Sequence, residues 1–166
     1  MASLEPIAII GMAGRFPASA DLDEFRHNVF SGRDCLTELS TDELLRWGAD
    51  PDLIQDPGYV RKRPLLADAD AFDAGAFAMT PREAELRDPQ YRLMLEISAD
   101  TLAHAGYDPG SYPDRIGLYA GSNANRYRYD YVEQRPDIFR TVGYLAVDIS
   151  SSPDYLSTFV SYKLGL

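Results

Sequence analysis

The feature of this sequence that most constrains its fold is the stretch DPQYRLMLEISADTLAHAG, residues 88–106. Asp88 is placed to cap a helix, Pro89 suits the first helical position, and Gly106 suits the end. The apolar residues between them cover most of the helix circumference: Leu93, Met94, Leu95, Ile97, Leu102 and Ala103. A helix that is apolar on nearly every side is expected to be enclosed by protein. The sequence therefore predicts a buried central helix.

Helix signals recur elsewhere along the chain. DLDEFRHNVFSG predicts a helix between a cap at Asp21 and a stop at Gly32, and STDELLRWG predicts one that starts at Ser40 or Thr41. TPREAE forms a capping box with proline at the first helical position. SSPDYLSTFVSYKLGL predicts a final helix over 153–164.

Two apolar runs that end in glycine predict buried strands, IAIIG at 7–11 and RIGLYAG at 115–121. The turn-rich stretch 50–73 predicts an irregular, partly extended surface segment. Strands that alternate with helices are typical of an α/β fold with a largely parallel sheet.

Composition narrows the class of protein. A chain of 166 residues is long enough for one domain with a sizeable core. Its net charge of -10 disfavours nucleic acid and anionic membranes as partners. No apolar run approaches the ~20 residues of a membrane span, and MASLEPIAII lacks the pattern of a secretion signal. A single cysteine fits a reducing compartment, so we expect a cytoplasmic location.

Residues that could carry chemistry are few. Cys35 follows the end of a predicted helix and stands beside Asp34, whose carboxylate opposes a thiolate, so we expect buried filler rather than a nucleophile. His27 and His104 have no cysteine or second histidine at metal-ligand spacing. IIGMAGRFP lacks the fingerprint of a phosphate loop, and DADAFD lacks the glycine of a calcium loop. We therefore expect neither a metal nor a bound cofactor.

Two surface features are candidates for binding. YVRKRP gathers Arg61, Lys62 and Arg63 in an acidic chain, either as a solvated basic edge or as a landing site for an acidic partner protein. NRYRYDY alternates three tyrosines with charged residues, which would line a pocket or, more simply, pack a short helix.

Four stretches in order resemble one family: EPIAIIGMAGRFP, FDAGAFAMTPREAELRDPQYRLMLE, RIGLYAGSN with its following DY, and FVSYKLGL. Together they resemble the N-terminal portion of the ketosynthase, or β-ketoacyl synthase, domain of modular type I polyketide synthases. The resemblance covers residues 5–166 and leaves 1–4 as a leader. FAMTP stands where the family has an FFGISP-like stretch, which we interpret as a conservative replacement.

The resemblance implies a partial thiolase-like fold, the N-terminal part of a usually dimeric enzyme layered as αβαβα. It implies a decarboxylative Claisen condensation between an acyl thioester and a malonyl-type unit on an acyl carrier protein, whose phosphopantetheine arm belongs to that carrier. The family's cysteine, in a TACSS-like block, and its two histidines come after the SYKLGL stretch. The chain is thus expected to be inactive alone and to fold with a complementary ketosynthase segment.

The resemblance also directs attention to particular residues. Asn123, Asn125 and Tyr131 are expected to contribute to the acyl pocket, because ligands gather beyond the carboxyl ends of parallel strands. Arg61–Arg63 are candidates for docking the carrier protein, and the final helix is expected to pack beside the dimer interface. Two other functions stay open: a non-catalytic interaction module that docks a carrier or neighbouring synthase subunit, and an independent enzyme that uses some other residue.

Overall fold

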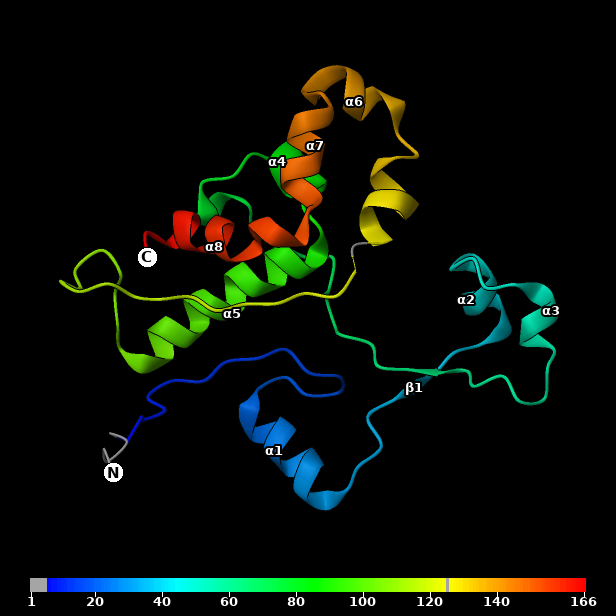
Figure 1. The fold of residues 1–166 in the computed structure, drawn as a ribbon. Helices are drawn as coiled ribbons and strands as arrows, with labels where there is room; N and C mark the ends of the chain where they lie inside the picture. The colour runs from blue at the N-terminus through cyan, green and yellow to red at the C-terminus, as the bar shows by residue number, and fades with distance from the viewer. Residues whose placement is uncertain (1–5, 125) are drawn as a thin grey trace, which may run out of the picture. The chain divides into compact units, whose positions relative to one another are not determined.

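The computed structural model describes residues 6–124 and 126–166 (Figure 1). The chain divides into two compact units. One unit comprises residues 14–68, and the other comprises residues 6–13 together with 69–166. Each unit has its own buried apolar cluster. No helix in the described ranges is long and apolar enough to cross a membrane.

The unit of residues 14–68 combines short helices with a two-stranded antiparallel sheet. In this sheet Thr37 pairs with Arg63 and Glu38 with Lys62. Its apolar cluster consists of Leu39, Leu44 and Ile54. The elements in order are α1 (Leu22–Ser31), β1 (Thr37–Glu38), α2 (Thr41–Arg46), α3 (Pro51–Ile54) and β2 (Lys62–Arg63).

The larger unit is helical and is built around α5 and α8, which pack against each other. Tyr91 and Leu95 of α5 are fully buried against Leu156 and Val160 of α8 in one apolar cluster. The buried Tyr91 hydroxyl donates to the carbonyl of Ser152, which ties α5 to the start of the final helical segment. The elements in order are η1 (Gly75–Phe77), α4 (Pro81–Leu86), α5 (Pro89–Ala105), the π-helical turn η2 (Arg128–Val132), α6 (Pro136–Val142), α7 (Tyr144–Ser151), η3 (Pro153–Tyr155) and α8 (Leu156–Leu164).

The helix boundaries confirm the predicted capping residues. Asp21 accepts a hydrogen bond from the backbone N–H of Glu24 at 2.8 Å, and Ser40 forms a reciprocal capping box at the start of α2. Thr80 does the same for α4. Asp88 caps α5, and Gly106 ends it in the left-handed conformation. These caps satisfy backbone groups that a helix end would otherwise leave without partners.

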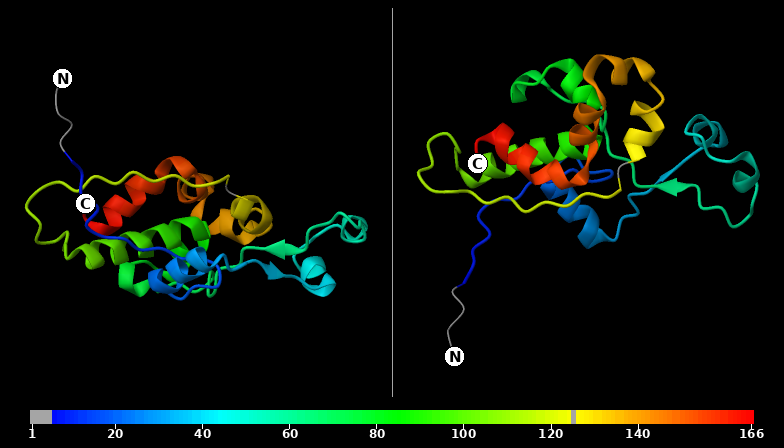
Figure 2. Two further views of the ribbon diagram at one scale, coloured as in Figure 1. Left: turned by 90° about the horizontal axis from the view of Figure 1, so that it is seen from below. Right: turned by 45° about the horizontal axis from the view of Figure 1, so that its top comes forward.

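The two predicted strands are wrong as strands. Residues 7–11 and 115–121 run extended but have no ladder partner among the described residues, where the one ladder joins β1 to β2. In Figures 1 and 2 the trace of 115–121 follows α5. Its side chains alternate as in a strand, since Leu118 and Ala120 pack on the core while Tyr119 is 98% exposed. A strand also needs a hydrogen-bonded neighbour, and sequence periodicity does not report whether one is present.

The expectation that α5 is enclosed on nearly every side is also wrong for the described residues. Tyr91, Leu95 and Ser98 are its buried positions, whereas Leu93 and Ile97 are only partly covered. The apolar runs at 7–11 and 115–121 show the same incomplete cover, with Ile7 96% and Ile9 83% exposed. These segments therefore carry more apolar surface than the described residues bury.

Another correction concerns FAMTP. Ala78 adopts φ 48°, in the left-handed region, as the residue that ends η1. This conformation favours glycine because a Cβ atom meets the neighbouring carbonyl oxygen there. Alanine in place of the glycine of an FFGISP-like stretch is therefore not conservative for the backbone.

Candidate functional site

The site is a cavity of about 650 Å³ within the larger unit, which we call the Tyr131 cavity. It is walled by the residues before α4, by α4 and α5, and by η2. Its lining is mostly apolar, with carboxylates, an arginine and two tyrosines at intervals. The lining residues are Ala69, Asp70, Phe72, Ala74, Pro81, Ala84, Glu85, Pro89, Arg92, Tyr127 and Tyr131. Its size lies within the ~300–1,000 Å³ typical of small-molecule sites.

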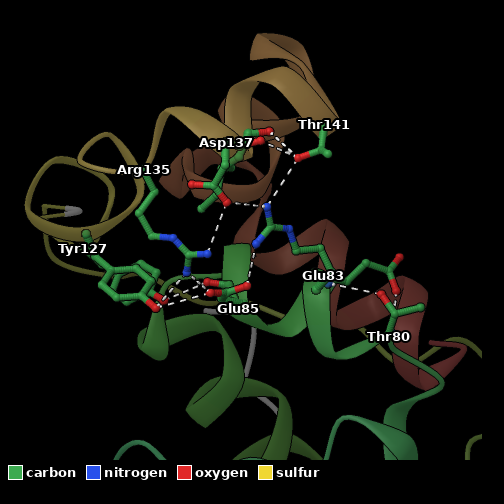
Figure 3. A network of polar contacts seen from close by, with 10 residues as sticks. Thr80, Glu83, Glu85, Tyr127, Arg135, Asp137 and Thr141 are labelled. Atoms are coloured by element: carbon green, nitrogen blue, oxygen red, sulfur yellow. Dashed lines mark hydrogen bonds and ion pairs between the residues drawn. The ribbon is translucent and has the colours of Figure 1, made fainter.

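Glu85 of α4 connects the helix to the segment that carries the two tyrosines. Its carboxylate accepts from Tyr131 Oη at 3.3 Å, from Arg82 Nη1 at 2.8 Å, and from Arg135 Nη1. Its backbone carbonyl accepts from Tyr127 Oη at 2.7 Å. Figure 3 shows Tyr127 and Arg135 both directed toward Glu85. One residue of α4 thus holds η2 and the residues after it.

A second carboxylate extends this network. Asp137, in the first turn of α6, lies 3.3 Å from Arg135 and 3.5 Å from Arg82 (Figure 3). Two arginines and two carboxylates therefore alternate between α4 and α6. Hydrogen bonding by Arg82, supplemented by Arg135 and Tyr131, lowers the pKa of Glu85. Hydrogen bonds to Tyr131 and Glu85 raise the pKa of Arg135. Both groups therefore remain charged at neutral pH.

The tyrosines form an aromatic wall. The rings of Tyr127 and Tyr131 stack with centroids 5.0 Å apart, and the guanidinium of Arg92 lies 5.9 Å from the Tyr127 ring. Burial raises the pKa of Tyr127, so its hydroxyl stays protonated and continues to donate to the Glu85 carbonyl. A wall of this kind presents apolar ring surface and directs its hydroxyls to protein partners.

The three residues predicted for the pocket differ in their relation to the cavity. Tyr131 lines the cavity. Asn123 is exposed and is not part of the lining, but it contacts Gln90, the neighbour of the lining residue Pro89. Asn125 lies outside the described residues. Glu85 and Arg92 were not singled out from the sequence, because their role depends on a contact with residues more than 30 positions away.

The predicted basic edge consists of side chains that already have partners. Arg61 donates to the Thr41 hydroxyl at 2.7 Å, and Arg63 lies 5.7 Å from the Tyr59 ring. Lys62 forms an ion pair with Asp34 at 2.5 Å, and both of these side chains are about half exposed, at 43% and 54%. Lys62 is therefore the most accessible of the three charges.

The other candidate residues have structural contacts. Cys35 is half-buried rather than buried, and its Sγ donates to the Arg33 carbonyl at 3.7 Å. His104 Nδ1 accepts from the Met12 N–H at 3.1 Å, whereas His27 is exposed. A Cβ on Gly11 would lie 2.7 Å from the Ala105 Cβ atom, so this glycine permits a close approach to α5. Within the described residues no cluster of histidine, cysteine and carboxylate side chains is arranged to hold a metal ion.

Comparison of the fold with solved structures defines the class of protein. The chain superposes on ketosynthase twelve from the bacillaene polyketide synthase of Bacillus amyloliquefaciens with a TM-score of 0.78 and 30% identity. It superposes on an oxazolomycin ketosynthase domain of Streptomyces albus with a TM-score of 0.74 and 31% identity. The two alignments cover 96% and 98% of this chain but 27% and 28% of those chains. The fold is therefore part of a thiolase-like ketosynthase, as predicted.

Sequence comparison gives the family. The model of the β-ketoacyl synthase N-terminal domain matches residues 4–166. The chain is 35% identical to a phenolphthiocerol/phthiocerol polyketide synthase of Mycobacterium tuberculosis and 40% identical to the erythronolide synthase EryA3 of Saccharopolyspora erythraea. The alignments cover 96% and 98% of this chain but 11% and 5% of those proteins. This chain belongs to the β-ketoacyl synthase family and corresponds to the N-terminal ketosynthase domain of type I polyketide synthases.

Proposed function

We propose that this chain is the structural N-terminal part of a polyketide ketosynthase and that the Tyr131 cavity forms part of its acyl-chain pocket. The observation that carries the proposal is the cavity wall itself. It is largely apolar, it is fixed by charged hydrogen bonds through Glu85, and it contains neither cysteine nor histidine. Such a wall can hold an acyl chain but cannot form a thioester with it.

The proposed reaction of the complete enzyme needs groups from outside these 166 residues. A cysteine thiolate takes the acyl group from one carrier protein as a thioester. A malonyl-type unit on a second carrier then loses CO₂, and the resulting carbanion attacks the thioester carbonyl. A carbon–carbon bond forms as the thiolate leaves. Two histidines assist decarboxylation, and the carrier's own phosphopantetheine arm delivers each substrate.

The contacts of this chain's own reactive residues support a framework role. The Cys35 thiol is engaged with a backbone carbonyl in its own loop, and His104 holds the backbone of Met12. A nucleophile needs an adjacent base or a helix N-terminus, and neither contact supplies one. We therefore propose that the chain alone does not catalyse condensation.

The exposed extended segments support a further part of the proposal, a complementary ketosynthase segment that covers them. Ile7, Ile9 and Tyr119 are largely exposed, on extended segments that have no ladder partner in the part of the chain that the structure describes. Exposed apolar edges of this kind promote association with another strand. Limited proteolysis and size-exclusion chromatography of the isolated chain test this part. A compact, protease-resistant monomer would contradict it.

The catalytic part of the proposal is tested by supplying the purified 166-residue chain with acyl-loaded and malonyl-loaded carrier protein. We expect no condensation product. Product should form when the polypeptide that carries the cysteine and histidines completes the enzyme, whether it is continuous with this chain or separate. We call this complete form the assembled ketosynthase. Turnover by the isolated chain would overturn the proposal.

The pocket assignment is tested in the assembled ketosynthase with Tyr131→Ala. Removing the ring enlarges the cavity, so the ratio of kcat/KM between long and short acyl thioesters should rise. Tyr129→Ala is the matched control, because Tyr129 lies on the same turn, is 60% exposed and does not line the cavity. An unchanged ratio in Tyr131→Ala would remove the pocket assignment.

A second candidate function is carrier docking at the basic edge, in an interaction module without catalysis. The accessibility of Lys62 favours this function. Its exposed ion pair with Asp34 contributes little to stability, so Lys62 can exchange Asp34 for a carboxylate of an acidic partner protein. Lys62→Glu should then weaken binding of an acidic carrier protein and reduce the salt dependence of binding. Equal binding by wild type and variant would argue against docking at this edge.

A further inference from the structure

The orientation of Tyr131 needs an explanation, because the residue is 40% exposed and lines the cavity. An exposed tyrosine ring ordinarily samples several rotamers. Here the hydroxyl donates to Glu85 Oε1 at 3.3 Å and accepts from Arg135 Nη1 at 3.2 Å. Both capacities of the phenol oxygen are thus used, and both partners belong to one ion pair.

A carboxylate suits this position better than an amide would. Glu85 Oε1 serves Tyr131 and Arg135, while Oε2 serves Arg82. All of these contacts use a carboxylate oxygen as the acceptor, and the two guanidinium contacts gain from its negative charge. Glutamine has a single acceptor oxygen, and its NH₂ group would face one of the two guanidinium groups. Replacement of the carboxylate therefore disrupts the contacts on one side.

Glu85 also lies where it can influence the cavity directly. It is one of the lining residues, and its backbone carbonyl holds the Tyr127 ring that stacks on Tyr131. The whole aromatic wall is therefore fastened to α4 at one residue. Glu83 is a second glutamate of the same helix and serves as the matched control. It forms the capping box with Thr80, on the side of α4 away from Tyr127 (Figure 3).

We infer that Glu85 is a positioning residue that sets acyl-chain preference by fixing the Tyr131 ring against the cavity. The inference rests on the proposed function of that cavity. It assigns the choice among acyl chains to a charged residue that does not itself need to contact the chain. Released from Glu85, the Tyr131 ring is no longer held in one position against the cavity, and longer acyl chains gain access.

The experiment uses the assembled ketosynthase and compares butyryl and octanoyl N-acetylcysteamine thioesters as acyl donors. Glu85→Gln should shift the octanoyl-to-butyryl ratio of kcat/KM by about fivefold toward octanoyl, a coupling typical of contacting residues. Glu85→Asp, which keeps the charge, should restore part of the wild-type ratio. Glu83→Gln should leave the ratio unchanged. Because Tyr131 no longer has its carboxylate partner in Glu85→Gln, adding Tyr131→Phe to that variant should produce no further shift.

The variants distinguish the positioning role of Glu85 from the pocket assignment of Tyr131. If Tyr131→Ala changes the ratio and Glu85→Gln does not, the positioning role is wrong and the pocket stands. If neither variant changes the ratio, the pocket assignment and the positioning role are both wrong. Arg135→Gln removes the other partner of Tyr131, so it replaces Glu85→Gln in the same comparison should that variant fail to fold.

Discussion

The side-chain amide of Gln90 hydrogen-bonds to both the backbone N–H and the backbone carbonyl of Asn123. Its Oε1 accepts from the Asn123 N–H at 2.9 Å, and its Nε2 donates toward the Asn123 carbonyl at 3.4 Å. A side chain of α5 thus supplies both hydrogen bonds that a neighbouring strand would give to one residue. This contact fixes the extended segment beyond 115–121 at the point where the chain turns toward η2.

Gln90→Ala should release this segment. The variant loses both hydrogen bonds to Asn123, and we expect a cost of about 1 kcal/mol. Hydrogen exchange of the Asn123 amide in the assembled ketosynthase should accelerate about fivefold, the equivalent of that energy. Gln55→Ala, at an exposed position after α3, is the control. Unchanged exchange at Asn123 in Gln90→Ala would show that the contact does not hold the segment.

Gly11→Ala should destabilise the larger unit. A Cβ atom at this position would lie 2.7 Å from both the Ala105 Cβ and the Thr101 carbonyl oxygen, which belong to α5 and cannot rotate away. Overpacking of this kind typically costs about 1–3 kcal/mol. Gly121→Ala is the matched control, because no described residue lies within 4 Å of its Cβ position apart from its chain neighbours. In urea unfolding of the assembled ketosynthase, the midpoint of Gly11→Ala should therefore lie below that of Gly121→Ala. Equal midpoints would contradict the close approach of residue 11 to α5.

Local signals in the sequence predicted the helices well. Asp21, Ser40, Thr80 and Asp88 all act as caps, because a cap is a contact between residues two or three positions apart. The final helix at 153–164 was also predicted, although it begins as the 3₁₀ turn η3. The helices α6 and α7 were not predicted, and neither has a side-chain cap to mark its start. The short helix α3 lies inside the stretch 50–73 that was predicted to be irregular, so that prediction is wrong there, although Asp50 caps the helix.

Features that depend on distant contacts were predicted poorly. The segments 7–11 and 115–121 have strand-like apolar patterns, but a ladder requires a neighbour that the pattern does not identify. Tyr131, predicted for the acyl pocket, lines the Tyr131 cavity, whereas the sequence does not mark Glu85. Glu85 contacts Tyr127, Tyr131 and Arg135, which lie 42 to 50 residues away along the chain. No local sequence pattern reports contacts over that separation.

Ala78→Gly should stabilise the protein. Ala78 is exposed and holds φ 48°, so glycine would relieve left-handed strain without loss of buried apolar surface. We expect a gain of about 0.5–1 kcal/mol, since relief of strain exceeds the extra entropy of glycine in the unfolded chain. Ala103→Gly, in the ordinary helical conformation of α5, should instead lose about 0.5–1 kcal/mol. A decrease in stability for both variants in urea unfolding would contradict the strain at Ala78.

The network around Glu85 should weaken in acid. Hydrogen bonding from Arg82, with Arg135 and Tyr131, lowers the pKa of Glu85 below its ordinary value of 4.5. A group whose pKa is lower in the folded state than in the unfolded state stabilises the protein above the unfolded value. That contribution disappears as the pH falls through the folded pKa. The thermal midpoints of wild type and Glu85→Gln should therefore differ at neutral pH and approach each other as the pH falls from 4.5 through the lower folded pKa of Glu85. Glu38→Gln, which replaces an exposed carboxylate on β1, is the matched control. A constant difference between wild type and Glu85→Gln at every pH would show that charge on Glu85 does not hold α4 to η2.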